Sequence, residues 1–216
     1  NMLAAQRSTA RLPTPAGTAA NECSLLLSPA SAIASCPGYQ KSATPVTPPG
    51  GEPSLRLKLG AVRYDQPRHV VIELQPGATA AVTATLELHE QPLASISSAE
   101  AAAASPGQAE LLAAEKLRLQ CVDVLDGLVS GMPDGGVTTC PPPDPAPMVQ
   151  WLSLAESSVA AQLEPVKALI ETVRAEIMLG VQADNWSKWG VHYARSLMAM
   201  LRTERRSNFR DKALQH

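Results

Sequence analysis

The spacing of apolar residues along the chain changes character several times. In LRLKLGAVRY, leucines alternate with Arg56 and Lys58, which places the leucines on one face of an extended strand. The segments HVVIEL and AVTATLELH follow, each bounded by turn-forming residues. Three such strands joined by short turns predict an antiparallel meander over residues 54–90.

Beyond the predicted meander the apolar spacing becomes helical. Ser105 and Pro106 have the character of an N-cap and a first helical residue, and Gly131 that of a helix stop. Residues 131–147 are rich in Pro and Gly, which predicts an irregular linker. Helices separated by this linker are therefore expected within residues 98–206.

Two more helices are predicted after the linker. Residues 148–179 place apolar side chains at steps of three and four, with Pro165 expected to kink the helix because proline removes a backbone donor. Gly180 is expected to end this helix. A third helix is predicted over residues 185–206.

The first 53 residues have a different composition. They consist mainly of Ala, Ser, Thr, Pro and Gly, a composition that buries too little surface to offset the entropy of ordering. We predict a disordered Pro/Ala-rich arm, in which the apolar patch at residues 25–27 docks on the folded part or adds a short strand.

These elements predict an α+β fold. A small antiparallel sheet of about three strands or more would pack with a C-terminal three-helix array, and one domain would cover residues 54–216. A sheet of this size is marginal by itself. We therefore expect helices, and strands supplied by a neighbouring region, to complete it.

Composition and charge narrow the classes of partner. The net charge is −2 and aromatic residues make up 3% of the chain, so neither nucleic acid nor an anionic membrane is an expected partner. The opening residues contain no long apolar stretch of the kind found in secretory signals or membrane spans. A cytosolic or nuclear, non-secreted protein is expected, and the sequon at Asn185 is then interpreted as coincidence.

The four cysteines, Cys23, Cys36, Cys121 and Cys140, form no C-x-x-C pair and have no histidine close by in the sequence. They are predicted to be reduced thiols, with Cys121 buried and Cys140 exposed in a loop rather than bridged. No metal and no cofactor is expected.

The segment NWSKWGVHYARSL carries most of the chain's large rings. Trp186, Trp189, Tyr193 and Leu197 recur at helical spacing, so they share one stripe of the third helix. Gly190 beside this stripe would let another backbone approach closely. The pattern predicts a docking face within the core.

Two functional alternatives concern the same region. Ser196 lies four residues after His192, and a Ser–His pair is the minimum for an activated nucleophile, but no acidic orienter or serine-bearing turn accompanies it. The basic tail around Phe209 could stack on single-stranded nucleic acid, although Glu204 and Asp211 dilute its charge. A structural role is the preferred interpretation of both.

The motif residues also resemble a known family. WGVHYARSL, followed by SNFRD, and the upstream LGAVRYDQPRHVVIEL are similar to the two ends of the Vwaint domain, which accompanies von Willebrand factor A and Hint-like domains. The matching residues are Gly60, Gln66, Arg68, Trp189, Gly190, His192, Tyr193, Ser196, Leu197, Asn208, Phe209, Arg210 and Asp211. The resemblance covers residues from about 55 to the C-terminus.

The resemblance implies a noncatalytic structural or protein-interaction module of a larger multidomain protein, with partners that include neighbouring domains of the same chain. The alternative is a part of a ubiquitin-ligase-type protein with a U-box or RING domain, in which this module presents a substrate or partner. The residues needed for Hint-type self-processing, a nucleophile at a splice junction and a terminal His-Asn, are not recognised in the sequence. Catalysis is therefore not expected within these residues.

Overall fold

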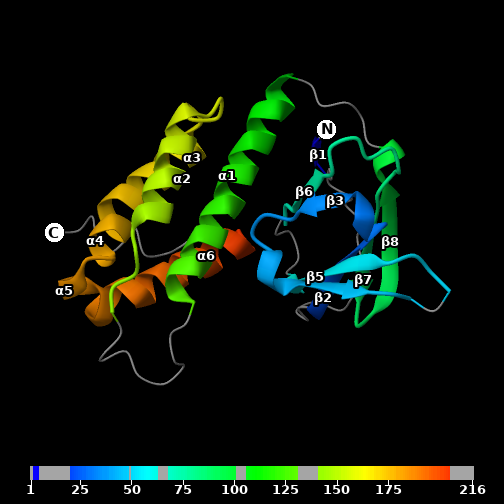
Figure 1. Cartoon of the computed structure of the whole chain (residues 1–216), viewed down its shortest axis with the longest axis horizontal. Helices are drawn as coiled ribbons and strands as arrows, with labels where there is room; N and C mark the ends of the chain where they lie inside the picture. Colours follow the sequence, from blue (N-terminus) through cyan, green and yellow to red (C-terminus); the bar gives the residue numbers. More distant parts are fainter. Residues whose placement is uncertain are drawn as a thin grey trace. The chain divides into compact units, whose positions relative to one another are not determined.

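The protein is an α+β protein, as predicted. The computed structural model describes residues 2–4, 20–48, 50–62, 68–100, 106–130 and 141–204 (Figure 1). The chain divides into two compact units: Asn1–Ser105, here the β unit, and Pro106–His216, here the helical unit. This division corrects the prediction of an arm followed by one domain that begins at residue 54.

The β unit contains two antiparallel sheets. Its strands are β1 (Met2–Ala4), β2 (Ala20–Ser28), β3 (Ile33–Ser35), β4 (Ala43–Val46), β5 (Ser54–Val62), β6 (Val71–Leu74), β7 (Thr83–Leu88) and β8 (Gln91–Ser97). The larger sheet has the order β4-β5-β2-β7-β8, and the smaller has the order β1-β6-β3. Short 3-10 turns occur at Ala30–Ala32, Gln40–Ser42 and Ser98–Glu100.

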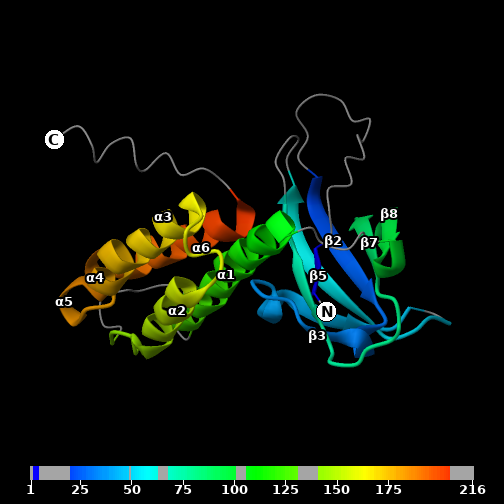
Figure 2. The same ribbon diagram turned by 90° about the horizontal axis from the view of Figure 1, so that it is seen from above.

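The predicted meander is wrong, because its three strands are not neighbours. β2 lies between β5 and β7, and β6 belongs to the other sheet (Figures 1 and 2). In β2, Leu27 pairs with Leu55 on one side and with Ala84 on the other. Leu27 is completely buried, so the strand expected to be a loose addition is a central part of this sheet.

The segment predicted as an arm therefore supplies strands that the small sheet lacked. β2, β3 and β4 all lie before residue 54, and β4 pairs with β5 along one edge. β8, which the sequence analysis did not predict, pairs with β7 along the other edge. As the central strand of five, β2 has a partner strand on each side.

A β-bulge lies at Gly60. Cys23 pairs with Gly60 and Ser24 with Lys58, so β5 contains one residue more than the facing part of β2. Gly60 has a φ of 70°, a left-handed conformation that glycine adopts without steric conflict. The extra residue interrupts the regular register near the end of β5.

The helical unit is built from α1 (Pro106–Val129), α2 (Ala146–Ser157), α3 (Glu164–Thr172), α4 (Met178–Gly180), α5 (Ala183–Asn185) and α6 (Val191–Thr203). Two π-helical turns, Val173–Ile177 and Trp186–Gly190, join α3 to α4 and α5 to α6. The predicted first helix and its start at Pro106 are confirmed. The cap at Ser105 and the stop at Gly131 lie outside the described residues, as does most of the predicted linker.

The second predicted helix is interrupted rather than kinked. Ser158 and Leu163 have extended backbones, with ψ of 149° and 133°, and the chain turns between them. Pro165 lies in the first turn of α3, where its missing N–H would have no intrahelical partner anyway. The proline starts a new helix instead of bending an old one, while Gly180 ends the α3–α4 run as predicted.

The helical unit has its own core. α1 contacts α2, α3 and α6. Trp151 of α2 is buried, and its indole Nε1 donates a hydrogen bond to the Leu117 carbonyl of α1, 3.0 Å away. A buried indole with a satisfied N–H anchors α2 in one position on α1.

Candidate functional site

Trp186 is a core residue. It begins the π-helical turn before α6, and only 1% of its surface is exposed. It belongs to the hydrophobic cluster that also contains Val173, Ile177 and Leu197. Its indole Nε1 has no hydrogen-bond acceptor among the described residues. The prediction that this ring lies in the core is confirmed.

Gly190 is the point of closest approach between two helical segments. A Cβ built on Gly190 would overlap the carbonyl of Gly180 and would lie 3.0 Å from its Cα. A Cβ on Gly180 would in turn lie 3.2 Å from the Trp189 ring. The predicted close backbone approach at Gly190 is confirmed, and its partner is the glycine that ends α4.

Trp189 and Tyr193 contact each other one helical turn apart. Their ring centroids are 6.2 Å apart and the planes meet at 83°, an edge-to-face arrangement. Both residues are half-buried, whereas Leu197 on the same stripe is buried. The stripe predicted for the third helix is therefore present, with its burial greatest at Trp186 and Leu197.

His192 and Ser196 lie on the opposite, solvent-facing side of α6. Both residues are exposed. Neither makes a hydrogen bond or ion pair with any of the described residues, and in particular they do not bond each other. A serine nucleophile needs a base within hydrogen-bond reach and a group that orients that base. This geometry gives the Ser–His alternative no support.

The upstream motif residues lie at the end of β5 and before β6. Arg68 donates from Nη2 to the Ala61 carbonyl, 3.2 Å away, and so braces the bulged end of β5 near Gly60. Gln66 lies outside the described residues. The same is true of the downstream motif residues Asn208, Phe209, Arg210 and Asp211.

Three of the four cysteines are described, and all three are free, as predicted. All three are also buried, which was predicted only for Cys121. Burial, together with the negative charge of the nearby Glu73 carboxylate, raises the pKa of Cys36 to about 12. Burial also raises the pKa of Cys121, and that of Cys23 despite the opposing charge of Arg68. Cys140 lies outside the described residues.

These thiols should be unreactive in the folded protein. Because their pKa values are raised, the thiolate is scarce at pH 8, at about one in ten thousand molecules for Cys36. In a Cys140→Ser variant, a disulfide reagent such as Ellman's should release almost no chromophore until guanidinium is added, and then the equivalent of three thiols. Rapid labelling of one thiol in the native variant would contradict this result.

A buried polar cluster lies on the larger sheet and was not predicted. Glu87 of β7 is only 5% exposed. It accepts hydrogen bonds from Ser24 Oγ of β2 and from Arg56 Nε of β5, both at 3.0 Å. Arg56 Nη1 also donates to Glu90, 2.8 Å away. Because side chains alternate along strands, this cluster lies on the sheet face opposite Leu27.

The same cluster holds the turn between β7 and β8. His89 and Glu90 have φ of 49° and 63°, so both are left-handed non-glycine residues. A two-residue hairpin with this geometry usually contains Asn-Gly. Here Arg56 bonds Glu90, and His89 Nδ1 lies 3.2 Å from a Glu22 carboxylate oxygen. The cluster is best described as a brace for this turn.

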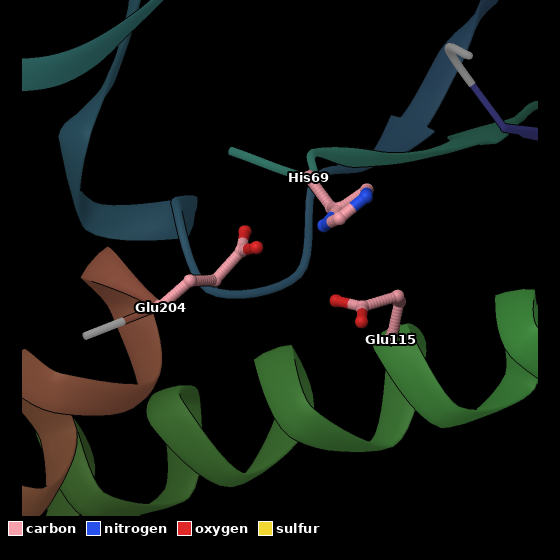
Figure 3. A group of neighbouring side chains, drawn as sticks. All are labelled: His69, Glu115 and Glu204. Atoms are coloured by element: carbon pink, nitrogen blue, oxygen red, sulfur yellow. The ribbon is translucent and has the colours of Figure 1, made fainter. Parts of the chain in front are cut away.

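A second charged group surrounds Arg118 of α1. Its Nε lies 2.8 Å from a carboxylate oxygen of Glu115, and its Nη2 lies 3.2 Å from Glu204, which follows α6. Its Nη1 donates to the Leu201 carbonyl. Figure 3 shows the carboxylates of Glu115 and Glu204. His69, also drawn there, belongs to the β unit, and we assign no metal site to residues of different units.

Two open grooves lie on the helical unit. The larger is lined by Val124, Gly127 and Leu128 of α1 and by Pro143 and Pro147 near the start of α2. The smaller lies between α2 and α3 and is lined mainly by charged residues, including Glu156 and Arg174. None of the residues predicted as a site lines either groove.

Comparisons with known proteins give no relative. The chain matches no protein-family model, no curated protein and no solved structure. Among the described residues, no helix has the length and apolar character required to cross a bilayer.

Proposed function

We propose that this chain is a noncatalytic structural and protein-interaction module of the Vwaint type, which works within a larger von Willebrand factor A-type protein. The observation that supports the proposal is the difference in burial among the motif residues of the aromatic segment. Of the motif residues on this segment, Gly190 and Leu197 are buried and Trp189 and Tyr193 are half-buried, whereas His192 and Ser196 are exposed without partners among the described residues. The buried and half-buried motif residues thus have a role in packing, which supports a structural module.

Three exposed apolar side chains of the helical unit are candidates for contact with a partner. Val149 and Leu154 of α2 and Val159 of the following turn are 47%, 49% and 75% exposed. Exposed large apolar side chains are one of the features found on docking surfaces. We propose that they bind the A-type domain of the same protein.

The first test is the reading frame that encodes the chain. A von Willebrand factor A-type domain in the same frame is expected, and its absence would contradict the proposal. A U-box or RING domain in that frame would favour the ubiquitin-ligase alternative instead.

The second test measures binding of the chain to that A-type domain by calorimetry. Replacing Val149, Leu154 and Val159 together by Ser should weaken binding at least about tenfold, the equivalent of roughly 1.4 kcal/mol. The matched control replaces the exposed polar residues Gln150, Ser153 and Ser157 of the same helix by Ala, with no expected change. Equal affinities for all three proteins would exclude this surface.

A further inference from the structure

The C-terminal end of α6 has no stop signal in the sequence. From Val191 to His216 the chain contains neither glycine nor proline, the residues that commonly end helices. The helix nevertheless ends at Thr203. Something other than local sequence preference therefore sets this boundary.

The residue after the helix adopts an unfavourable backbone conformation. Glu204 has φ of 54° and ψ of 31°, the left-handed region that is usually filled by glycine at this position. Its amide still donates to the Met200 carbonyl, as in a continuing helix. The helical conformation therefore ends at Glu204, in a left-handed conformation that residues other than glycine usually avoid.

Arg118 accounts for this departure through two contacts. Its Nη2 bonds the Glu204 carboxylate, 3.2 Å away, and both side chains are largely buried, at 14% and 12% exposed. Its Nη1 donates to the carbonyl of Leu201. In a continuing helix that carbonyl would accept from the amide of the residue four positions later, so Arg118 occupies the place of that donor.

A third contact orients the guanidinium. Glu115, one turn before Arg118 on α1, lies 2.8 Å from Nε and 2.6 Å from Nη2. The planar fork of an arginine can satisfy several acceptors at once in a fixed geometry, which a lysine ammonium does not do. Glu115 therefore aims Arg118 at the end of α6.

We propose that Arg118 and Glu204 form a charge-held stop that ends α6, and that breaking this pair lets the helix continue past residue 204. The inference goes beyond the proposed function, because it requires no partner. It assigns to α1 the control of where the last helix ends.

The decisive comparison uses two substitutions of one residue. Glu204→Ala removes the carboxylate and leaves a residue that avoids the left-handed region, so φ at residue 204 should become negative and the helix should lengthen. Glu204→Gly removes the same carboxylate but keeps the left-handed conformation accessible, so α6 should still end at Thr203. Arg118→Gln should reproduce the effect of Glu204→Ala.

The measurements are made on the whole chain. Three-bond HN–Hα couplings and Cα chemical shifts report φ at residue 204, and ellipticity at 222 nm reports a gain of roughly one helical turn, or about four residues. Thermal unfolding confirms that each variant is folded. A positive φ that persists in Glu204→Ala, or equal lengthening in the Ala and Gly variants, would overturn the proposal.

Discussion

A chain that lacks residues 1–47 is expected to lose the fold of the β unit. The deletion removes β2, the strand that lies between β5 and β7, together with β1, β3 and β4. The remaining β5 and β7 would have no common partner, and isolated pairs of strands are marginally stable at best. Amide hydrogen exchange should show no protection in β7, while the amides of α2 remain protected.

A single substitution in β2 also tests whether this strand is central to the sheet. Leu27→Ala, at a fully buried position of β2, should lower the free energy of unfolding by about 2–5 kcal/mol. Ser31→Ala, at an exposed position shortly after the same strand, should change it by less than about 0.5 kcal/mol. If protection in β7 survives the deletion, β2 is not the central strand.

Trp186→Ala is expected to be the most damaging single truncation in the helical unit. The ring is 1% exposed and lies in the cluster that includes Val173 and Ile177, so its removal leaves a large cavity. The expected loss in the free energy of unfolding is about 3–5 kcal/mol, measured by urea unfolding. Trp186→Phe should cost less, because it also removes an indole N–H that has no acceptor among the described residues.

Two neighbouring substitutions provide the reference. Trp189→Ala should have a smaller effect than Trp186→Ala, because the Trp189 ring is only half-buried. His192→Ala, on the exposed side of α6, should stay within about 0.5 kcal/mol of the unsubstituted chain. A stability loss at His192 as large as that at Trp186 would contradict the assignment of Trp186 to the core.

The features predicted correctly from the sequence are those that depend on residues close together in the chain. The start of the first helix at Pro106, the aromatic stripe from Trp186 to Leu197, and the close approach at Gly190 depend on residues within a few turns of each other. The break before Pro165 was predicted only as a kink, because the apolar spacing continues through residues 158–163. Ser158, just after α2, and Pro165, in the first turn of α3, are the local sequence features that mark the break.

The sheet was predicted poorly because strand order depends on partners far away in the chain. Spacing identifies β5 and β7 as strands, but it does not say that β2 lies between them. The run CSLLL in β2 did carry a signal, since a short continuous apolar run is consistent with a buried strand. Its Ala-, Ser- and Pro-rich surroundings concealed that signal.

The charged groups could not be found from sequence for the same reason. Ser24, Arg56 and Glu87 lie on three different strands and meet only through their register. Arg118 and Glu204 lie 86 residues apart in the sequence, although their side chains are in contact. Neither group leaves a local motif, so only the folded chain brings its members together.

The central position of β2 has a consequence for the order of folding. β2 ends at Ser28, but one of its two partners begins at Ser54 and the other at Thr83. During synthesis the larger sheet cannot close until β7 has left the ribosome, and long loops must close before their contacts form. The larger sheet of the β unit should therefore form only after β5 and β7 are both available to β2.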